Sequence, residues 1–451
     1  MIKKTFILGL FIIWTGNLSW AQSSFLGIQN SPRKGMLNSL MNPAEINNLN
    51  RLVDVLFVGA QGTFGNNTIT FNEFLDNRRN LVDFAINKAE RPISFRSEAE
   101  IIGPSVGIRL NKWAFGINTK TIANTNMLNI DARLSEAFSD FEIQSNNNIV
   151  NINSPYNQRV YLGNWSEIGL MLGREVFSSN IHRLSFGANF RIIFPQNYIN
   201  LGVDNIRGTL IQENLNFSLT NADGRVNLIY SSENIPNNNF NFSFEGFQFK
   251  DPSGLGLDIG ANYQLLDKEG TKLNAGLAVR GLGSIAYTQG NIINNSFSFN
   301  IPQGQFYRLD ELRGSLGDIE RRIQESNFFQ KENPPSSFET SLPTQLVVYG
   351  EWMFNKIFYI SANSHQRLGN NRNNTQITSQ NLIIITPRIL LGKFEVYSPW
   401  AHFEVSGLSG GLGFRFGGFF IGSNSIITGV LSDGKMIDFH TGLSWSFGKR
   451  Q

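Results

Sequence analysis

Residues 437–447, close to the end of the chain, alternate between apolar and polar side chains without a break. One side of the alternation carries Ile437, Phe439, Thr441, Leu443, Trp445 and Phe447, and the other carries Asp438, His440, Gly442, Ser444 and Ser446. Successive side chains of a β-strand point to opposite faces, so this pattern predicts a strand with one apolar and one polar wall. About eleven residues are enough for a tilted strand to cross a bilayer.

The same alternation recurs along the chain in pairs of segments that are separated by short turns rich in Gly, Asn, Asp or Lys. Two alternating segments around such a turn predict a β-hairpin. The predicted pairs are residues 101–110 with 113–119, 165–176 with 184–194, 255–265 with 273–286, 346–354 with 358–364, 382–391 with 394–397, and 412–416 with 419–426. Residues 53–59 and 437–447 add a first and a last strand.

Longer polar segments lie between the hairpins, at residues 66–100, 122–158, 289–341 and 368–380. Short turns that alternate with long loops are typical of bacterial transmembrane barrels. A less regular pair, residues 206–220 and 226–231 around Asp223-Gly224, raises the strand count to about sixteen, or leaves about fourteen if the pair projects as a loop. We therefore predict an all-β fold, a transmembrane antiparallel β-barrel of about 14 (up to 16) strands.

A soluble β-sandwich could show the same alternation, with its apolar face as the core. Composition favours the barrel. Charged residues make up 16% of the chain, against about 25% in ordinary soluble domains, and there are 38 Phe and 43 Gly. The sequence has no Cys, so no disulfide framework stabilises an exported protein, whereas a closed barrel satisfies its backbone internally.

The first 21 residues have the features of a secretory signal peptide. Lys3 and Lys4 precede an apolar core, and Ser19-Trp20-Ala21 forms a small-x-small cleavage site. The polar, Asn-rich segment that follows contains Pro43 and is expected to be irregular. The predicted organisation is a signal peptide at 1–21, an N-terminal plug-like segment at 22–52 and an outer-membrane barrel at 53–451, so we expect an outer-membrane location.

Two of the long loops contain helix signals. Thr70 and Glu73 have the spacing of a capping box. Apolar residues then recur at helical spacing from Leu309 to Ile323, which predicts one apolar stripe on a helix. One interpretation is a helix that covers the barrel mouth, and the other is a stripe that docks on another protein.

The polar faces of the predicted strands are the candidate lumen-facing residues. They include Arg183, Arg191, Asp258, Asn262, Arg280, Arg415, Asp438 and His440. The four His residues have none of the spacings typical of a metal site. His440 and Ser444 share a face but lie about 13 Å apart along a strand, so the protein is not expected to be an enzyme. No cofactor motif and no Lys/Arg cluster for nucleic acid is present.

Three short stretches resemble a family of Bacteroidota outer-membrane barrels of unassigned function. They are Leu40-Met41-Asn42-Pro43-Ala44, residues 256–263 and residues 413–423. The first is similar to a box in fatty-acid transporters of the FadL type and in the PorV component of the type IX secretion system. The resemblance implies that the N-terminal segment enters the lumen, which makes Asn42, Pro43 and Ala44 candidate plug residues.

Two functions follow as expectations. The polar lumen face and the plug-like segment favour passive uptake of a small amphiphilic or polar ligand past a displaceable plug. The alternative is a non-transporting scaffold, a PorV-like partner of a secretion or surface-assembly machine, which rests on the stripe at residues 309–323. Outer-membrane lipid is an expected partner in both cases, with a small ligand in the first and a secretion or surface protein in the second.

Overall fold

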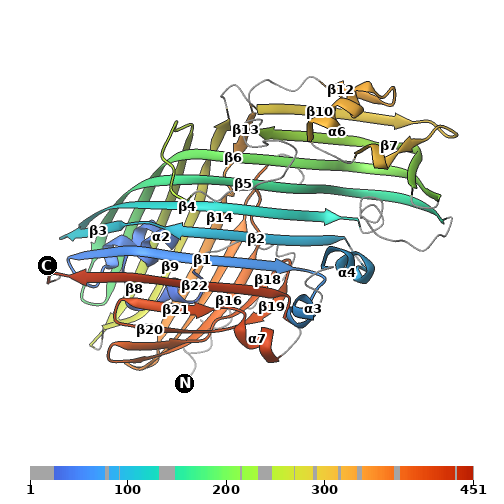
Figure 1. The fold of residues 1–451 in the computed structure, drawn as a ribbon. Helices are drawn as coiled ribbons and strands as arrows, with labels where there is room; N and C mark the ends of the chain where they lie inside the picture. The colour runs from blue at the N-terminus through green and yellow to red at the C-terminus, as the bar shows by residue number, and fades with distance from the viewer. Residues whose placement is uncertain are drawn as a thin grey trace, which may run out of the picture.

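The chain forms a closed β-barrel with a helical segment inside it and a sheet that extends beyond one end (Figure 1). The computed structural model describes residues 25–76, 81–90, 92–131, 148–213, 216–231, 246–268, 270–287, 292–312, 316–332, 338–369, 376–431 and 434–449. The predicted signal peptide, residues 1–21, lies outside these ranges.

The barrel is one antiparallel sheet that closes on itself through 14 strands, the lower of the two predicted counts. Around the ring these are β1 (Val53–Asn66), β2 (Ile93–Ile102) with β3 (Ser105–Leu110), β4 (Trp113–Ile130), β5 (Asn148–Ser178), β6 (His182–Glu213), β8 (Gly254–Asp267), β9 (Gly270–Tyr287), β13 (Phe338–Ser341) with β14 (Gln345–Met353), β15 (Phe358–Arg367), β16 (Leu382–Leu391), β17 (Phe394–Tyr397) with β18 (Trp400–Phe403), β19 (Gly407–Gly410) with β20 (Leu412–Phe416), β21 (Phe419–Ser423) and β22 (Met436–Phe447). Pairing of β22 with β1 closes the ring, so the barrel has no free edge.

The outer wall of the barrel is apolar and the inner wall is polar. On β22, Phe439 and Trp445 are 49% and 62% exposed, whereas His440 is 1% exposed. A sandwich core would bury the apolar side instead, so the predicted barrel orientation is confirmed. An apolar exterior on a closed barrel is the surface that a lipid bilayer requires.

Two barrel strands are far longer than predicted. β5 has 31 residues and β6 has 32, and both run past the barrel end that carries the long loops, which we call the loop end (Figure 1). There they continue into an extension sheet with β7 (Asn216–Ser231), β10 (Ile292–Ile301), β11 (Tyr307–Arg308) and β12 (Phe329–Glu332). The Asn-rich segments predicted as loops are therefore partly strands, because their polar side chains face water rather than breaking the sheet.

The predicted turn at Asp223-Gly224 is wrong, since both residues lie within β7. The pairing of β6 with β7 shifts register between Asp204 and Thr209, and Asn205 and Asn221 have positive φ values. Asn and Gly are common in β-bulges as well as in turns, and here these residues lie at a bulge. The hairpin of β6 and β7 projects from the barrel, as the predicted count of about 14 strands required.

The predicted stripe at residues 309–323 forms two short elements, η5 (Leu309–Leu312) and α6 (Leu316–Glu325). Leu316 and Ile323 are buried against the extension sheet, where Ile323 clusters with Leu228 and Phe297. The helix therefore neither covers the barrel mouth nor offers these residues to a partner protein. Within the described part of the chain, no helix is long and apolar enough to span a bilayer.

Three further helices lie in the loops, namely α3 (Phe71–Asp76), α4 (Leu81–Lys88) and α7 (Ile426–Leu431). The predicted capping box before α3 is confirmed, because the Thr70 amide donates to Glu73 Oε2 and the Glu73 amide donates to Thr70 Oγ1. The segment at residues 25–50 forms η1 (Ile28–Asn30), α2 (Met36–Met41) and η2 (Pro43–Asn48), so the prediction of irregular structure is wrong there.

Candidate functional site

Residues 25–50 fill the lumen near the barrel end that carries the short turns, which we call the turn end, and we name them the plug (Figure 1). Met36, Leu40, Ile46 and Leu49 of the plug belong to one buried apolar cluster. Their partners on the barrel wall are Leu56, Ile102, Ala114, Met171, Tyr397 and Phe420. The plug thus has its own small core against the strands that surround it.

Local capping explains why α2 and η2 form despite a poor helical sequence. The amide of Met36, at the start of α2, donates to the carboxylate of Asp54 on β1 at 2.7 Å. A carboxylate at a helix N-terminus satisfies a free N–H and complements the helix dipole. Asn42 accepts from the amide of Ala44 at 3.0 Å, and Pro43 occupies the first turn of η2, where its missing N–H costs nothing.

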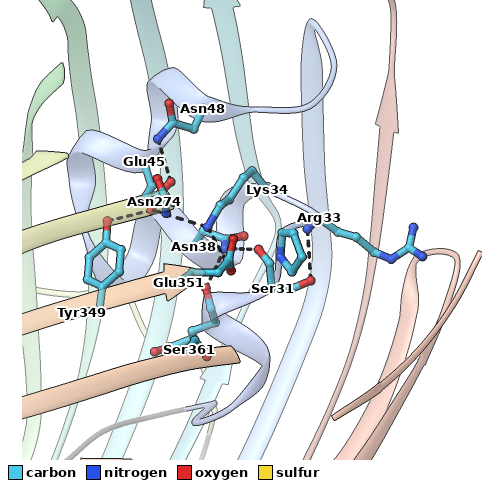
Figure 2. Close-up of polar contacts among 12 residues, drawn as sticks. Ser31, Arg33, Lys34, Asn38, Glu45, Asn48, Asn274, Tyr349, Glu351 and Ser361 are labelled. Carbon is cyan, nitrogen blue, oxygen red and sulfur yellow. Dashed lines mark hydrogen bonds and ion pairs between the residues drawn. The ribbon is translucent and has the colours of Figure 1, made fainter. Parts of the chain in front are cut away.

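Glu45 is the centre of the polar contacts between plug and wall (Figure 2). Its side chain is fully buried. Its two oxygens accept hydrogen bonds from Asn48 at 2.8 Å, Asn274 at 2.7 Å, Tyr349 at 2.7 Å and Asn262 at 3.2 Å. Burial alone would raise the pKa of this carboxyl group, but Lys34 and these hydrogen bonds outweigh that effect, and the pKa of Glu45 is lowered.

Ion pairs extend the contact on both sides of Glu45. The ammonium of Lys34 lies 3.6 Å from Glu45 and 3.7 Å from Glu351 on β14. On the neighbouring wall, Glu395 pairs with Arg388 at 2.8 Å and accepts from Ser31 of the plug at 2.8 Å. These charges are almost fully buried, so each depends on its partner for stability.

Two wall glycines let the plug approach closely. A Cβ on Gly187 would lie 2.4 Å from the carbonyl carbon of Pro43 and 2.5 Å from the amide of Ala44. A Cβ on Gly260 would lie 1.9 Å from Asn42 Oδ1. The predicted plug residues therefore lie directly against β6 and β8, and Asn42 also donates to the carbonyl of Ala261 at 2.9 Å.

A small polar cavity of about 60 Å³ lies in the lumen on the loop-end side of the plug. A chain of ion pairs crosses its wall, with Lys120 to Glu167 at 3.3 Å, Glu167 to Arg191 at 3.0 Å and Arg191 to Asp258 at 2.9 Å. The remaining charged lining residues are Glu98, Glu100 and Arg280. The cavity is thus a charged chamber rather than an apolar tunnel.

The chamber is covered on its loop-end side by aromatic side chains and an inward-folded loop. Tyr198 contacts Tyr161, Tyr287 and Phe338, with ring centroids 4.8–5.5 Å apart. Arg96 donates to the carbonyl of Thr378 and Arg159 to that of Gln376, both at 2.9 Å. The loop residues 377–381 are buried, so this part of the loop folds into the lumen.

The predicted lumen-facing residues fall into separate groups. Arg191 and Asp258 meet in the chamber, Arg280 lines it, and Asn262 lies at Glu45. Arg183 is half-buried toward the turn end. At the closing seam, Asp438 accepts from Ser425 and Asn424, His440 contacts the Tyr397 hydroxyl at 2.7 Å, and Arg415 donates to Ser444 at 3.3 Å. His440 and Ser444 therefore have different partners.

Sequence reasoning missed the residues that form the central polar contacts between plug and wall. Glu45 directly follows the Asn-Pro-Ala box, and Tyr349 and Glu351 alternate with outward residues on β14, so a signal was present. Among the described residues, no group of three or more His, Asp or Glu side chains could hold a metal ion.

Residues 43–424 match the model of a family of unknown function (DUF5723). The chain belongs to this family. The matched range contains Glu45, its hydrogen-bond partners and most of the barrel. No curated protein matches this DUF5723 chain.

Several solved barrels are similar to the DUF5723 chain in architecture. A TodX deltaS2S3 mutant, a monoaromatic hydrocarbon channel, has a TM-score of 0.43 and 8% identity, covering 95% of this chain and 94% of that one. The CymD monoaromatic hydrocarbon channel has a TM-score of 0.40 and 10% identity, covering 93% and 94%. The P. putida toluene transporter TodX has a TM-score of 0.40 and 9% identity, covering 91% and 94%.

Proposed function

We propose that this protein is an outer-membrane barrel that admits a small polar or amphiphilic ligand by passive uptake when its plug is displaced. The observation that supports this function is a polar chamber, closed on its turn-end side by a segment that is bound through hydrogen bonds and ion pairs. Such contacts can be exchanged for water when the segment moves, and their net contribution is modest for each bond. The charges in the chamber favour a polar ligand over a hydrocarbon.

The scaffold alternative loses its motivating observation, because the stripe at residues 309–323 packs on the extension sheet of the same chain. Uptake also explains the charged residues of the chamber better than catalysis does. Four charged side chains of the chamber wall pair with one another in a chain rather than around a nucleophile.

A disulfide between plug and wall tests the uptake function. A Cβ built on Gly260 lies 2.9 Å from Asn42 Cγ, close to the separation of about 3 Å between a sulfur and the opposite Cβ in a disulfide. The Asn42→Cys/Gly260→Cys variant should therefore oxidise readily, and the chain has no other Cys to interfere. In liposomes we expect the oxidised variant to exclude labelled L-arabinose and the reduced variant to admit it.

The two single variants, Asn42→Cys and Gly260→Cys, serve as controls, because neither can form the cross-link. Their arabinose uptake should not respond to oxidant. Equal uptake by the oxidised and reduced double variant would show that the ligand path does not require movement of the plug.

A further inference from the structure

The charges that line the chamber are not all paired with each other. Lys120, Glu167, Arg191 and Asp258 neutralise one another in the chain of ion pairs described above. Arg280 lines the same chamber from β9 but forms no ion pair with any residue that the structure describes. Its Nε is buried without a hydrogen-bond partner.

Two buried amides point to the same conclusion. Gln345 and Asn124 both line the chamber and are 8% and 3% exposed. Gln345 Oε1 and Asn124 Oδ1 are each buried without a hydrogen-bond partner. Because buried polar groups in native proteins are nearly always satisfied, two such groups in a cavity that also holds an unpaired guanidinium indicate a ligand site.

The opposite wall of the chamber is acidic. Glu98 and Glu100 follow one another on the inward face of β2, and both line the chamber that Arg280 enters from β9. Glu98 accepts a long hydrogen bond of 3.5 Å from Gln61, and no ion pair joins it to Arg280. The chamber thus presents a cationic donor on one side and carboxylates on the other. Gln345 is the cross-strand neighbour of Arg280, and Asn124 is that of Glu98.

We propose that the chamber binds a small ligand that carries both an ammonium and a carboxylate group, as free amino acids do. The carboxylate would accept hydrogen bonds from Arg280, whose planar guanidinium suits a carboxylate, and the ammonium would donate to Glu98 and Glu100. Asn124, the cross-strand neighbour of Glu98, would accept from the third ammonium hydrogen. This site names a substrate class for the uptake function proposed above and rests on that function for its role.

Equilibrium binding to the purified full chain in detergent tests the assignment with two probes. L-Lysine carries the carboxylate, and cadaverine is the same molecule without it. We expect the wild-type protein to bind lysine more tightly than cadaverine. Arg280→Gln should weaken lysine binding about tenfold or more, as expected for a lost charge-assisted hydrogen bond. It should not weaken cadaverine binding, because it removes a cation that repels the diamine. Glu98→Gln should weaken both probes.

Matched variants keep the test decisive. Arg207→Gln removes an exposed cation on the extension and should change neither probe. Arg280→Lys keeps the charge and should retain most of the lysine binding. If Arg280→Gln does not fold, lysine binding by Gln345→Leu tests the site instead. Heat-modifiable migration on gels reports folding of each variant.

Equal binding of lysine and cadaverine by the wild type, or an equal loss of both in Arg280→Gln, would overturn the site. The outcomes also separate this inference from the uptake function. Arabinose uptake that follows the disulfide, with no lysine binding, would refute the site alone. Lysine binding with the expected variants, but with no uptake in either redox state, would refute the uptake function and leave the site standing.

Discussion

Replacing Glu45 with glutamine is expected to release the plug from the lumen while the barrel stays folded. Glutamine offers one acceptor oxygen where the carboxylate offers two, and it leaves the buried ammonium of Lys34 with Glu351 alone. Removing one partner of a buried ion pair costs about 3–5 kcal/mol. Trypsin should therefore cleave after Arg33 or Lys34 in Glu45→Gln and spare these sites in the wild type.

Glu73→Gln is the matched control, since Glu73 pairs with Lys88 at 2.6 Å on the surface of a loop. Exposed pairs contribute about 0–1 kcal/mol, so trypsin sensitivity of the plug should not change. A Glu45→Gln plug that resists trypsin as the wild type does would contradict the central position of Glu45.

Acid should have the same effect as the substitution. The pKa of Glu45 is lowered in the folded protein, so its stabilising contribution is present above the ordinary value of 4.5 and is lost as the pH falls through the lowered pKa. In planar bilayers, wild-type conductance should rise as the pH falls below 4.5. Conductance of Glu45→Gln should already be high at neutral pH and should respond less to acid.

Replacing Gly187 with alanine is expected to displace the plug through crowding rather than through charge. The new Cβ would lie 2.4 Å from the Pro43 carbonyl carbon, and a backbone atom cannot rotate away as a side chain would. Overpacking of a close contact costs about 1–3 kcal/mol. We expect labelled arabinose to enter liposomes with Gly187→Ala faster than with the wild type.

The control is Gly62→Ala on β1, where a Cβ would meet nothing within 4 Å. Both variants add one methyl group to a barrel strand, so their difference isolates contact with the plug. Equal uptake by Gly187→Ala and Gly62→Ala would show that β6 does not hold the plug at Pro43.

The barrel was predictable because membrane-crossing strands obey one simple rule. From β8 to β22, an apolar side chain facing lipid alternates with a polar or small one facing the lumen, as in Leu255, Leu257 and Ile259. The extension was not predictable by the same rule, because water surrounds it and its faces need not differ. Asp223 and Gly224 therefore resembled turn residues although they lie at a bulge.

The plug contacts were only partly predictable. The resemblance at the Asn-Pro-Ala box implied that this segment enters the lumen. The partners of Glu45, however, come from β8, β9 and β14, and sequence spacing cannot show which strands face each other across a lumen. The unpaired state of Arg280 depends in the same way on distances between strands that lie far apart in the chain.

Asp54 joins three parts of the molecule, since its carboxylate accepts from the plug at Met36 and from Ser446 on the last strand. Ser446 is 392 residues away in sequence, and Tyr349, which donates to Glu45, is 304 residues away from its acceptor. Contacts so distant in sequence form late, because loop closure must come first. The plug is synthesised before every strand of the barrel, yet it can complete its contacts with the wall only after the strands that carry its partners are in place.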